Sequence, residues 1–277
     1  MTRITVAPGR GRSVLGLRSG ALAVRVLAQD ADGARVALVA NGALLLAGDA
    51  VEVEVDVAAG AWLEVVETTG TVAYGGAEPS RWDVDVRLGA GATLTWGALP
   101  FVVSDGARTH RRTEVHLGEG ARAVLRETLV LGRAGQVGGD LWSRLTTHDA
   151  AGPLQVEELD LSRSARGLPG VLTTGPVAAP RTVVDTVLAL GWRPATPAGM
   201  PDDGATFLEL DRPGAVLRWL GTALHHDTVG DRCLDAWADE LAGARTMAPA
   251  PAPAPAPVPA HRTAPDPLRT THTEEHA

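Results

Sequence analysis

Hydrophobic and polar residues alternate along three segments of the chain, and a Gly-Ala pair follows each segment within a few residues. A period of two places successive side chains on opposite faces of an extended strand, so each segment predicts a strand with one buried face. The glycine after each segment supplies the turn into the next strand. The three copies are Val51–Val57 with Gly60, Val84–Leu88 with Gly91, and Glu114–Leu117 with Gly120.

The glycine pattern recurs at a nearly constant spacing. Weaker copies begin at Gly33 and Gly152, so that neighbouring marker glycines are 27 to 32 residues apart. Repetition at a fixed period indicates one strand-turn-strand unit stacked on itself, because a single unit cannot bury its apolar face. We therefore expect an all-β protein with an elongated core of stacked β-sheets, similar to a β-helix.

The remaining segments complete this architecture. Strands are expected in succession from about residue 14 to 162, and further short strands at 182–190, 206–210 and 215–220. Apolar residues at helical spacing predict one C-terminal helix over Val229–Ala242. A single scaffold domain would then cover residues 1–245, and the Ala-Pro repeats within 246–277 predict a disordered tail.

Composition narrows the class of protein. The formal charge of −8 argues against a nucleic-acid binder, and we interpret Arg108, Arg111 and Arg112 as solvated strand faces. All 25 basic residues are arginines, which excludes the chemistry of a Schiff-base or phosphate-loop lysine. Cys233 is the single cysteine, so no intrachain disulfide can form. No apolar run approaches the roughly 18 residues of a membrane span, and we expect a cytoplasmic protein without membrane contact.

The familiar catalytic signatures are missing from the sequence. It contains no Gly-x-Ser-x-Gly elbow, no His-Glu-x-x-His helix and no EF-hand loop. We interpret His110, His116 and His148 as solvent-facing strand residues, because no acid or histidine recurs at a fixed offset from them. We therefore expect no catalytic residue, no firm metal ligand and no tightly bound cofactor.

Glu127 is the most informative acidic residue. It lies in residues 125–133, where apolar residues are nearly continuous. Such a run predicts a strand buried on both faces, and a buried carboxylate needs a cation, a hydrogen-bond donor or a metal. An ion pair with Arg126 or Arg133 is one explanation. A place on a polar passage through the interior is the other.

The fold class leaves three functions open. A long β body favours a binding scaffold, but parallel β-helices also host carbohydrate-active enzymes. Glu67 and Glu127 each lie seven residues beyond a marker glycine and could form the stacked carboxylate pair of such an enzyme, with Trp96 and Gly97 in the matching place between them. A structural or adhesive repeat protein is the third alternative.

The order of four segments resembles that in a known family. The segments are Gly42–Asp49, Gly91–Ala107, Glu127–Arg133 and Gly214–Gly221. In their order and spacing, over roughly residues 14 to 225, they resemble the urease accessory protein family UreD, which is called UreH in some organisms.

The resemblance implies a maturation scaffold that is not an enzyme. Such a protein would bind apo-urease and the accessory protein UreF, which recruits the GTPase UreG, and it would support nickel delivery into the urease active site. Nickel would bind only transiently, because a conduit needs few and weak ligands. Four acidic residues are then candidates for a polar route or for partner contacts: Asp49, Asp105, Glu127 and Asp140.

Overall fold

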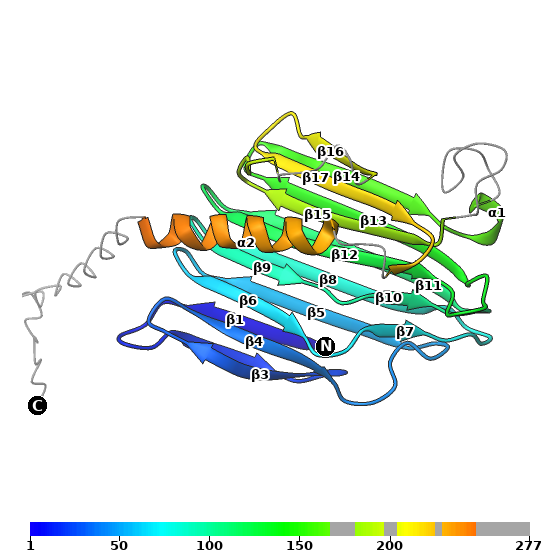
Figure 1. Ribbon diagram of the computed structural model, residues 1–277. Coiled ribbons are helices and arrows are strands. Elements are labelled where there is room, and N and C mark those ends of the chain that lie inside the picture. Colours follow the sequence, from blue (N-terminus) through cyan, green and yellow to red (C-terminus); the bar gives the residue numbers. More distant parts are fainter. Residues whose placement is uncertain (167–180, 197–203, 225–228, 248–277) are drawn as a thin grey trace, which may run out of the picture.

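Two β-sheets packed face to face form the body of the protein (Figure 1). The structure is a computed structural model that describes residues 1–166, 181–196, 204–224 and 229–247. The predicted tail therefore lies outside the described residues, apart from the last turn of the C-terminal helix.

Sheet A has seven strands in the order β14-β13-β11-β8-β5-β1-β2. Their bounds are β1 Thr2–Ala7, β2 Val14–Arg18, β5 Ala50–Val57, β8 Ser80–Leu88, β11 Arg108–Leu117, β13 Asp140–Asp149 and β14 Gly152–Asp160.

Sheet B has ten strands, of which eight follow the order β16-β17-β15-β12-β9-β6-β4-β3, while β10 pairs with β12 and β7. Their bounds are β3 Leu22–Gln29, β4 Gly33–Ala40, β6 Trp62–Glu67, β7 Thr71–Ala73, β9 Thr93–Gly97, β10 Phe101–Val103, β12 Arg122–Leu131, β15 Val183–Leu190, β16 Ala205–Glu209 and β17 Gly214–Gly221.

The middle of the molecule is a stack of parallel rungs, as the repeat predicts. In sheet A, Val53 of β5 pairs with Val84 of β8, which in turn pairs with Thr113 of β11. In sheet B, Leu63 pairs with Leu94, and Leu94 pairs with Ala123. The chain thus passes from one sheet to the other and advances by one strand in each repeat, which confirms the predicted β-helix-like core.

Three marker glycines make the turns between the sheets. Gly60, Gly91 and Gly120 have φ angles of 70°, 65° and 66°, in the left-handed region that favours glycine. Each turn connects a strand of sheet A to the next strand of sheet B, so that part of the prediction is confirmed.

The two outer copies of the repeat are different, because they belong to antiparallel hairpins. Gly33 begins β4, which is antiparallel to β3, and it pairs with Trp62, two residues beyond Gly60. Gly152 begins β14, which is antiparallel to β13. The interpretation of these two glycines as further rung turns was wrong, since a glycine before an alternating segment also occurs where a hairpin starts its return strand.

Sheet B is interrupted in two neighbouring rungs. Residues 68–70 separate β6 from β7, and residues 98–100 separate β9 from β10. Neither segment is part of a strand. The next strand, β12, is unbroken and pairs with both β9 and β10. The interruption leaves a gap in the backbone pairing beside the middle of β12.

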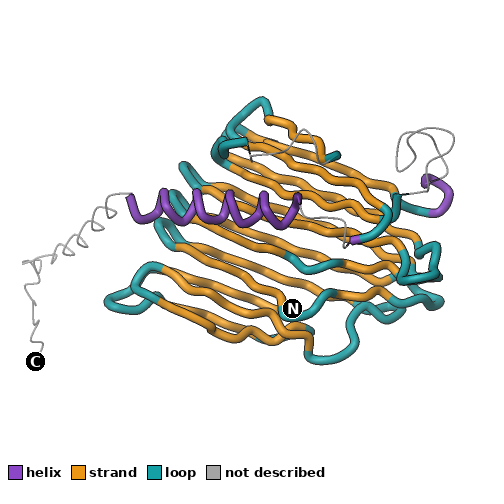
Figure 2. Tube along the Cα trace, viewed as in Figure 1, coloured by secondary structure: helices purple, strands orange, loops and turns teal. Residues whose placement is uncertain are grey.

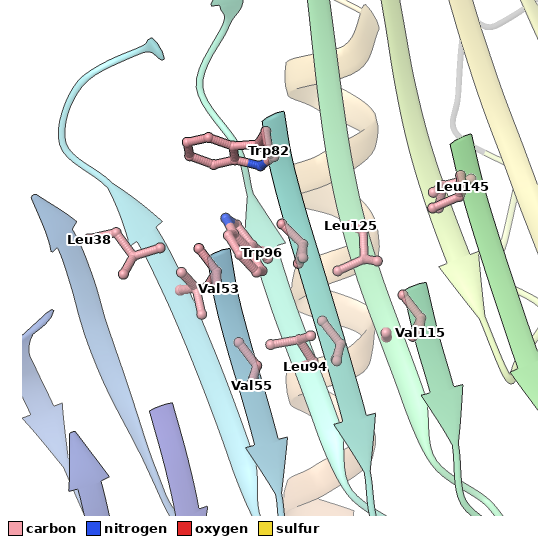
Figure 3. Packing of buried hydrophobic residues seen from close by; sticks show 14 of the residues in the cluster. Leu38, Val53, Val55, Trp82, Leu94, Trp96, Val115, Leu125 and Leu145 are labelled. Carbon is pink, nitrogen blue, oxygen red and sulfur yellow. The ribbon is translucent and has the colours of Figure 1, made fainter. Parts of the chain in front are cut away.

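The main core lies between the sheets, where Val53, Val55, Leu94, Val115 and Leu125 pack together (Figure 3). Burying an aliphatic side chain of this size contributes about 1.5–3 kcal/mol.

Helix α2 (Val229–Met247) lies across the outer face of sheet B (Figure 2). A second core lies under this helix and includes Cys233 and Trp237. The predicted helix thus exists and extends to Met247. A short helix, α1 (Arg163–Arg166), follows β14. None of the helices in the described part of the chain is long and apolar enough to cross a bilayer.

Candidate functional site

A small cavity lies between the two sheets, next to the interruption of sheet B. Glu67, Trp96, Arg111, Thr113 and Glu127 are among the residues that line it. The space open to the centres of water molecules is about 40 Å³. A single buried water requires roughly 10–15 Å³ by this measure, so the cavity can hold about three waters. It is far smaller than a typical ligand pocket of about 300–1,000 Å³.

Glu127 points into this cavity from the middle of β12. Its Oε1 atom lies 2.6 Å from Nη1 of Arg111 and accepts a hydrogen bond of 2.9 Å from the hydroxyl of Thr113. Both partners are on β11, in the opposite sheet. Only 14% of the Glu127 side chain and 7% of the Arg111 side chain are exposed, so the ion pair is largely shielded from solvent.

The partner of Glu127 differs from the one expected. Arg126 is adjacent on the same strand, so its side chain points to the opposite face, where it pairs with Asp185 of β15. Arg111 was expected on a solvated face but is buried. Its inward direction follows from the alternation of β11, which places Arg111 on the same face as the buried Thr113 and Val115.

Glu67, the last residue of β6, supplies a second carboxylate to the cavity. Its Oε1 atom accepts a hydrogen bond from the indole N–H of Trp96 at 3.1 Å, and its Oε2 atom accepts one from the backbone N–H of Leu99 at 3.0 Å. Burial raises the pKa of Glu67 above its ordinary value, against the lowering effect of these two hydrogen bonds and of the charge of Arg111.

The position between the two glutamates differs by one residue from the expectation. Gly97 pairs with Val66 and with Arg126, so the place level with Glu67 and Glu127 falls on Ala98, just after β9 ends. Glu67 on β6 and Glu127 on β12 thus occupy the same level of the stack, and β9 lies between their two strands.

Arg111 is incompletely satisfied in this environment. Its Nε atom is buried and has no hydrogen-bond partner among the described residues. Its guanidinium carbon lies 5.7 Å from the centre of the Phe101 ring, a distance at which a cation is attracted to the ring face. Trp82 and Trp96 also point into the space between the sheets at this end of the core (Figure 3). The cavity therefore combines two carboxylates and one guanidinium with aromatic walls.

Asp105 and Asp140 lie outside the cavity and close to each other. Asp105 accepts a hydrogen bond of 2.7 Å from the backbone N–H of Gly138, and Asp140 accepts one of 2.7 Å from the backbone N–H of Arg163. The guanidinium of Arg163 also lies 3.4 Å from Asp105. Both carboxylates thus hold loops at the end of the stack where β11 and β13 begin.

Asp49 stands apart from this pair, in the turn before β5. Its Oδ2 atom accepts a hydrogen bond of 2.9 Å from the backbone N–H of Leu46. The structure therefore places Glu127 alone of the four candidates in the cavity, and the roles of the other three in partner contacts or a polar route stay predictions.

The outer face of sheet A carries another group of potential metal ligands. One ligand atom from each of Asp85, Glu114 and His116 lies within 4.8 Å of the others. However, Asp85 pairs with Arg87 at 3.0 Å, and Glu114 pairs with Arg112. Because both carboxylates already have guanidinium partners, we describe this group as part of a charged surface.

The fold and the cavity together define a class: a β-solenoid-like scaffold whose interior carries charged side chains around a water-sized hollow. The sequence model of the UreD urease accessory protein family matches residues 2–253. The chain therefore belongs to the UreD family of urease accessory proteins, which are maturation factors and not catalysts.

Individual relatives agree with this assignment. The chain is 43% identical to urease accessory protein UreD 1 of Streptomyces griseus subsp. griseus over 205 residues, which cover 73% of this chain and 75% of the relative. It is 36% identical to UreD of Streptomyces coelicolor over 218 residues, covering 76% and 84% of the two chains. It is 34% identical to UreD of Frankia alni over 223 residues, covering 74% and 73%.

Proposed function

We propose that this protein is a urease maturation scaffold that binds apo-urease and a UreF-type accessory protein, and through the latter a UreG-type GTPase. In this role it supports the delivery of nickel into the urease active site. The observation that carries the proposal is the buried carboxylate cavity around Glu127 in a member of an accessory-protein family. The cytoplasmic location expected from the sequence is part of the proposal.

The cavity has the chemistry that a conduit for a cation requires. Glu67 and Glu127 provide oxygen ligands, and the hydroxyl of Thr113 lies beside Glu127. A site with several strong ligands would hold nickel too tightly to release it, whereas isolated carboxylates with a few waters bind weakly and exchange. The water-sized volume of the cavity admits small ions and excludes a sugar ring, which weighs against the alternative of a carbohydrate-active enzyme.

The surface offers places for large partners. Exposed apolar side chains gather on the edge strands β2 and β3, namely Val14, Leu17, Val26 and Leu27. Apolar residues at a sheet edge are unfavourable in water and are commonly covered by another chain. We therefore propose this end of the stack as a partner surface. The outer face of sheet A, in contrast, carries rows of charged residues.

Co-expression with the urease subunits and the UreF-type and UreG-type proteins tests the proposal. We expect affinity-purified chain to retain both apo-urease and the UreF-type protein, and the urease obtained to contain nickel. Failure to retain either protein would contradict the scaffold role.

A charge-neutral variant tests the cavity separately. The Glu127→Gln variant should retain both partners but reduce the nickel content of urease at limiting nickel. The matched control is Glu64→Gln, which alters a glutamate on an outer face, where it pairs with Arg35 at 3.1 Å, and should leave the nickel content unchanged.

A further inference from the structure

The guanidinium of Arg111 occupies the place in the cavity where a mobile cation would find its best ligand. Its Nη1 atom lies 2.6 Å from Oε1 of Glu127, and its side chain is 7% exposed. The same carboxylate oxygen is held by the hydroxyl of Thr113. A cation arriving at Glu127 therefore meets both a fixed positive charge and a carboxylate oxygen that is already engaged.

Stability alone gives a poor account of this arginine. Its Nε donor is buried without a hydrogen-bond partner among the described residues, and such a group is costly to desolvate. Buried ion pairs often stabilise a fold no better than apolar residues of similar size. The position of Arg111 in a hollow, beside two carboxylates, thus calls for a role other than packing.

We infer that Arg111 is a tethered cation that competes with divalent metal ions for Glu127 and so keeps the cavity closed to them in the isolated protein. The inference rests on the proposed function only for the kind of cargo, a divalent transition-metal ion. When Arg111 leaves Glu127, the two glutamates, Thr113 and a few waters form a weak oxygen site. Oxygen ligands and low coordination by the protein suit a hydrated ion that is bound and released.

Titration of the purified full-length chain with nickel chloride tests this inference. Calorimetry and the quenching of tryptophan fluorescence report binding, the latter because Trp96 lines the cavity. The Arg111→Gln variant should bind one nickel ion at least tenfold more tightly than the unmodified chain. Adding Glu127→Gln to this variant should abolish the gain.

Arg144→Gln is the matched control, because Arg144 lies on the exposed outer face of sheet A, pairs with Glu158 at 3.1 Å and has no contact with the group of Asp85, Glu114 and His116. Its nickel affinity should equal that of the unmodified chain. An equal gain in this variant would show a general effect of charge and would overturn the inference. So would a folded Arg111→Gln variant with unchanged nickel affinity.

A conservative variant keeps the test decisive if Arg111→Gln does not fold. In Arg111→Lys the positive charge remains, but a single ammonium replaces the guanidinium fork. We expect a smaller gain in nickel affinity, about threefold, and no gain would count against the inference. These measurements use no urease, so a failed pull-down together with the expected gain in nickel affinity for Arg111→Gln would refute the scaffold role and leave the inference about Arg111 standing.

Discussion

Arg126 and Glu127 are neighbours on β12, but they lie on opposite faces of the strand and their charges have different partners. Arg126 points under α2, where it contacts the carboxylates of Asp185 and Asp231. Burial alone would lower the pKa of Arg126, but these carboxylates raise it above its ordinary value. Glu127 points into the hollow between the sheets, where its partner Arg111 retains an unsatisfied Nε donor.

The packing around the two pairs differs in the same way. Gly230, in the first turn of α2, lies so close to Asp185 that a Cβ atom built on it would be 1.9 Å from Oδ2. Glu127 instead borders the hollow between the two sheets. An arginine held by two carboxylates beneath a closely packed helix indicates a structural anchor, whereas a pair inside the hollow between the sheets leaves room for a transported ion. Three experiments break or sharpen this distinction.

Removal of Asp185 should have the largest effect. Asp185→Ala leaves Arg126 without its main partner in a buried setting, and breaking such a pair typically costs about 3–5 kcal/mol. Urea unfolding of the full chain measures this loss. Cys233, whose pKa burial raises to about 12, also becomes a reporter of α2, because its alkylation should accelerate when the helix detaches. A loss of stability below about 1 kcal/mol would contradict the role of Asp185 as an anchor.

A pair of threonine variants compares the two faces directly. Thr128 donates to Asp185 on the face under α2, and Thr113 donates to Glu127 at the cavity. Thr128→Val should cost about 1–3 kcal/mol, because it removes a donor from the carboxylate of Asp185, whose side chain is only 1% exposed. Thr113→Val should cost less than about 1 kcal/mol, because a water in the cavity can take its place. Equal losses in urea unfolding would remove the distinction between the two faces of β12.

The smallest effect concerns the pH dependence of Glu67. Burial raises its pKa from an ordinary 4.5, so the folded state binds the proton more tightly than the unfolded state does. The stabilisation is complete below the unfolded pKa and is lost as the pH rises through the folded pKa. The free energy of unfolding of the unmodified chain, relative to Glu67→Gln, should therefore fall as the pH rises above the ordinary pKa of 4.5. A difference that grows with pH would contradict a raised pKa.

The repeat in the sequence was sufficient to predict the middle of the fold. The alternation in Val51–Val57 and the glycines at 60, 91 and 120 define the rungs, because both strand direction and turn conformation are local properties. The hairpins at Gly33 and Gly152 could not be told from rungs, since parallel and antiparallel partners leave the same alternation on a strand.

The site was predicted only in part, because a local pattern gives the direction of a side chain but not its partner on another strand. The apolar run around Glu127 correctly indicated a strand covered on both faces, by the opposite sheet and by α2. Its ion-pair partner lies on another sheet, and alternation within β11 gives the direction of Arg111 but not what it faces. Contacts between sheets depend on the packing of the whole stack, which no local pattern encodes.

The antiparallel hairpins at the margins of the parallel stack have a consequence for assembly. A run of identical parallel layers presents at each end a template on which another copy can add, and such growth produces filaments. Reversal of chain direction in β3 and in β14 ends each run with a strand unlike those inside it. The parallel stack thereby has a fixed length, and the strands at these two margins do not repeat the pairing found inside it.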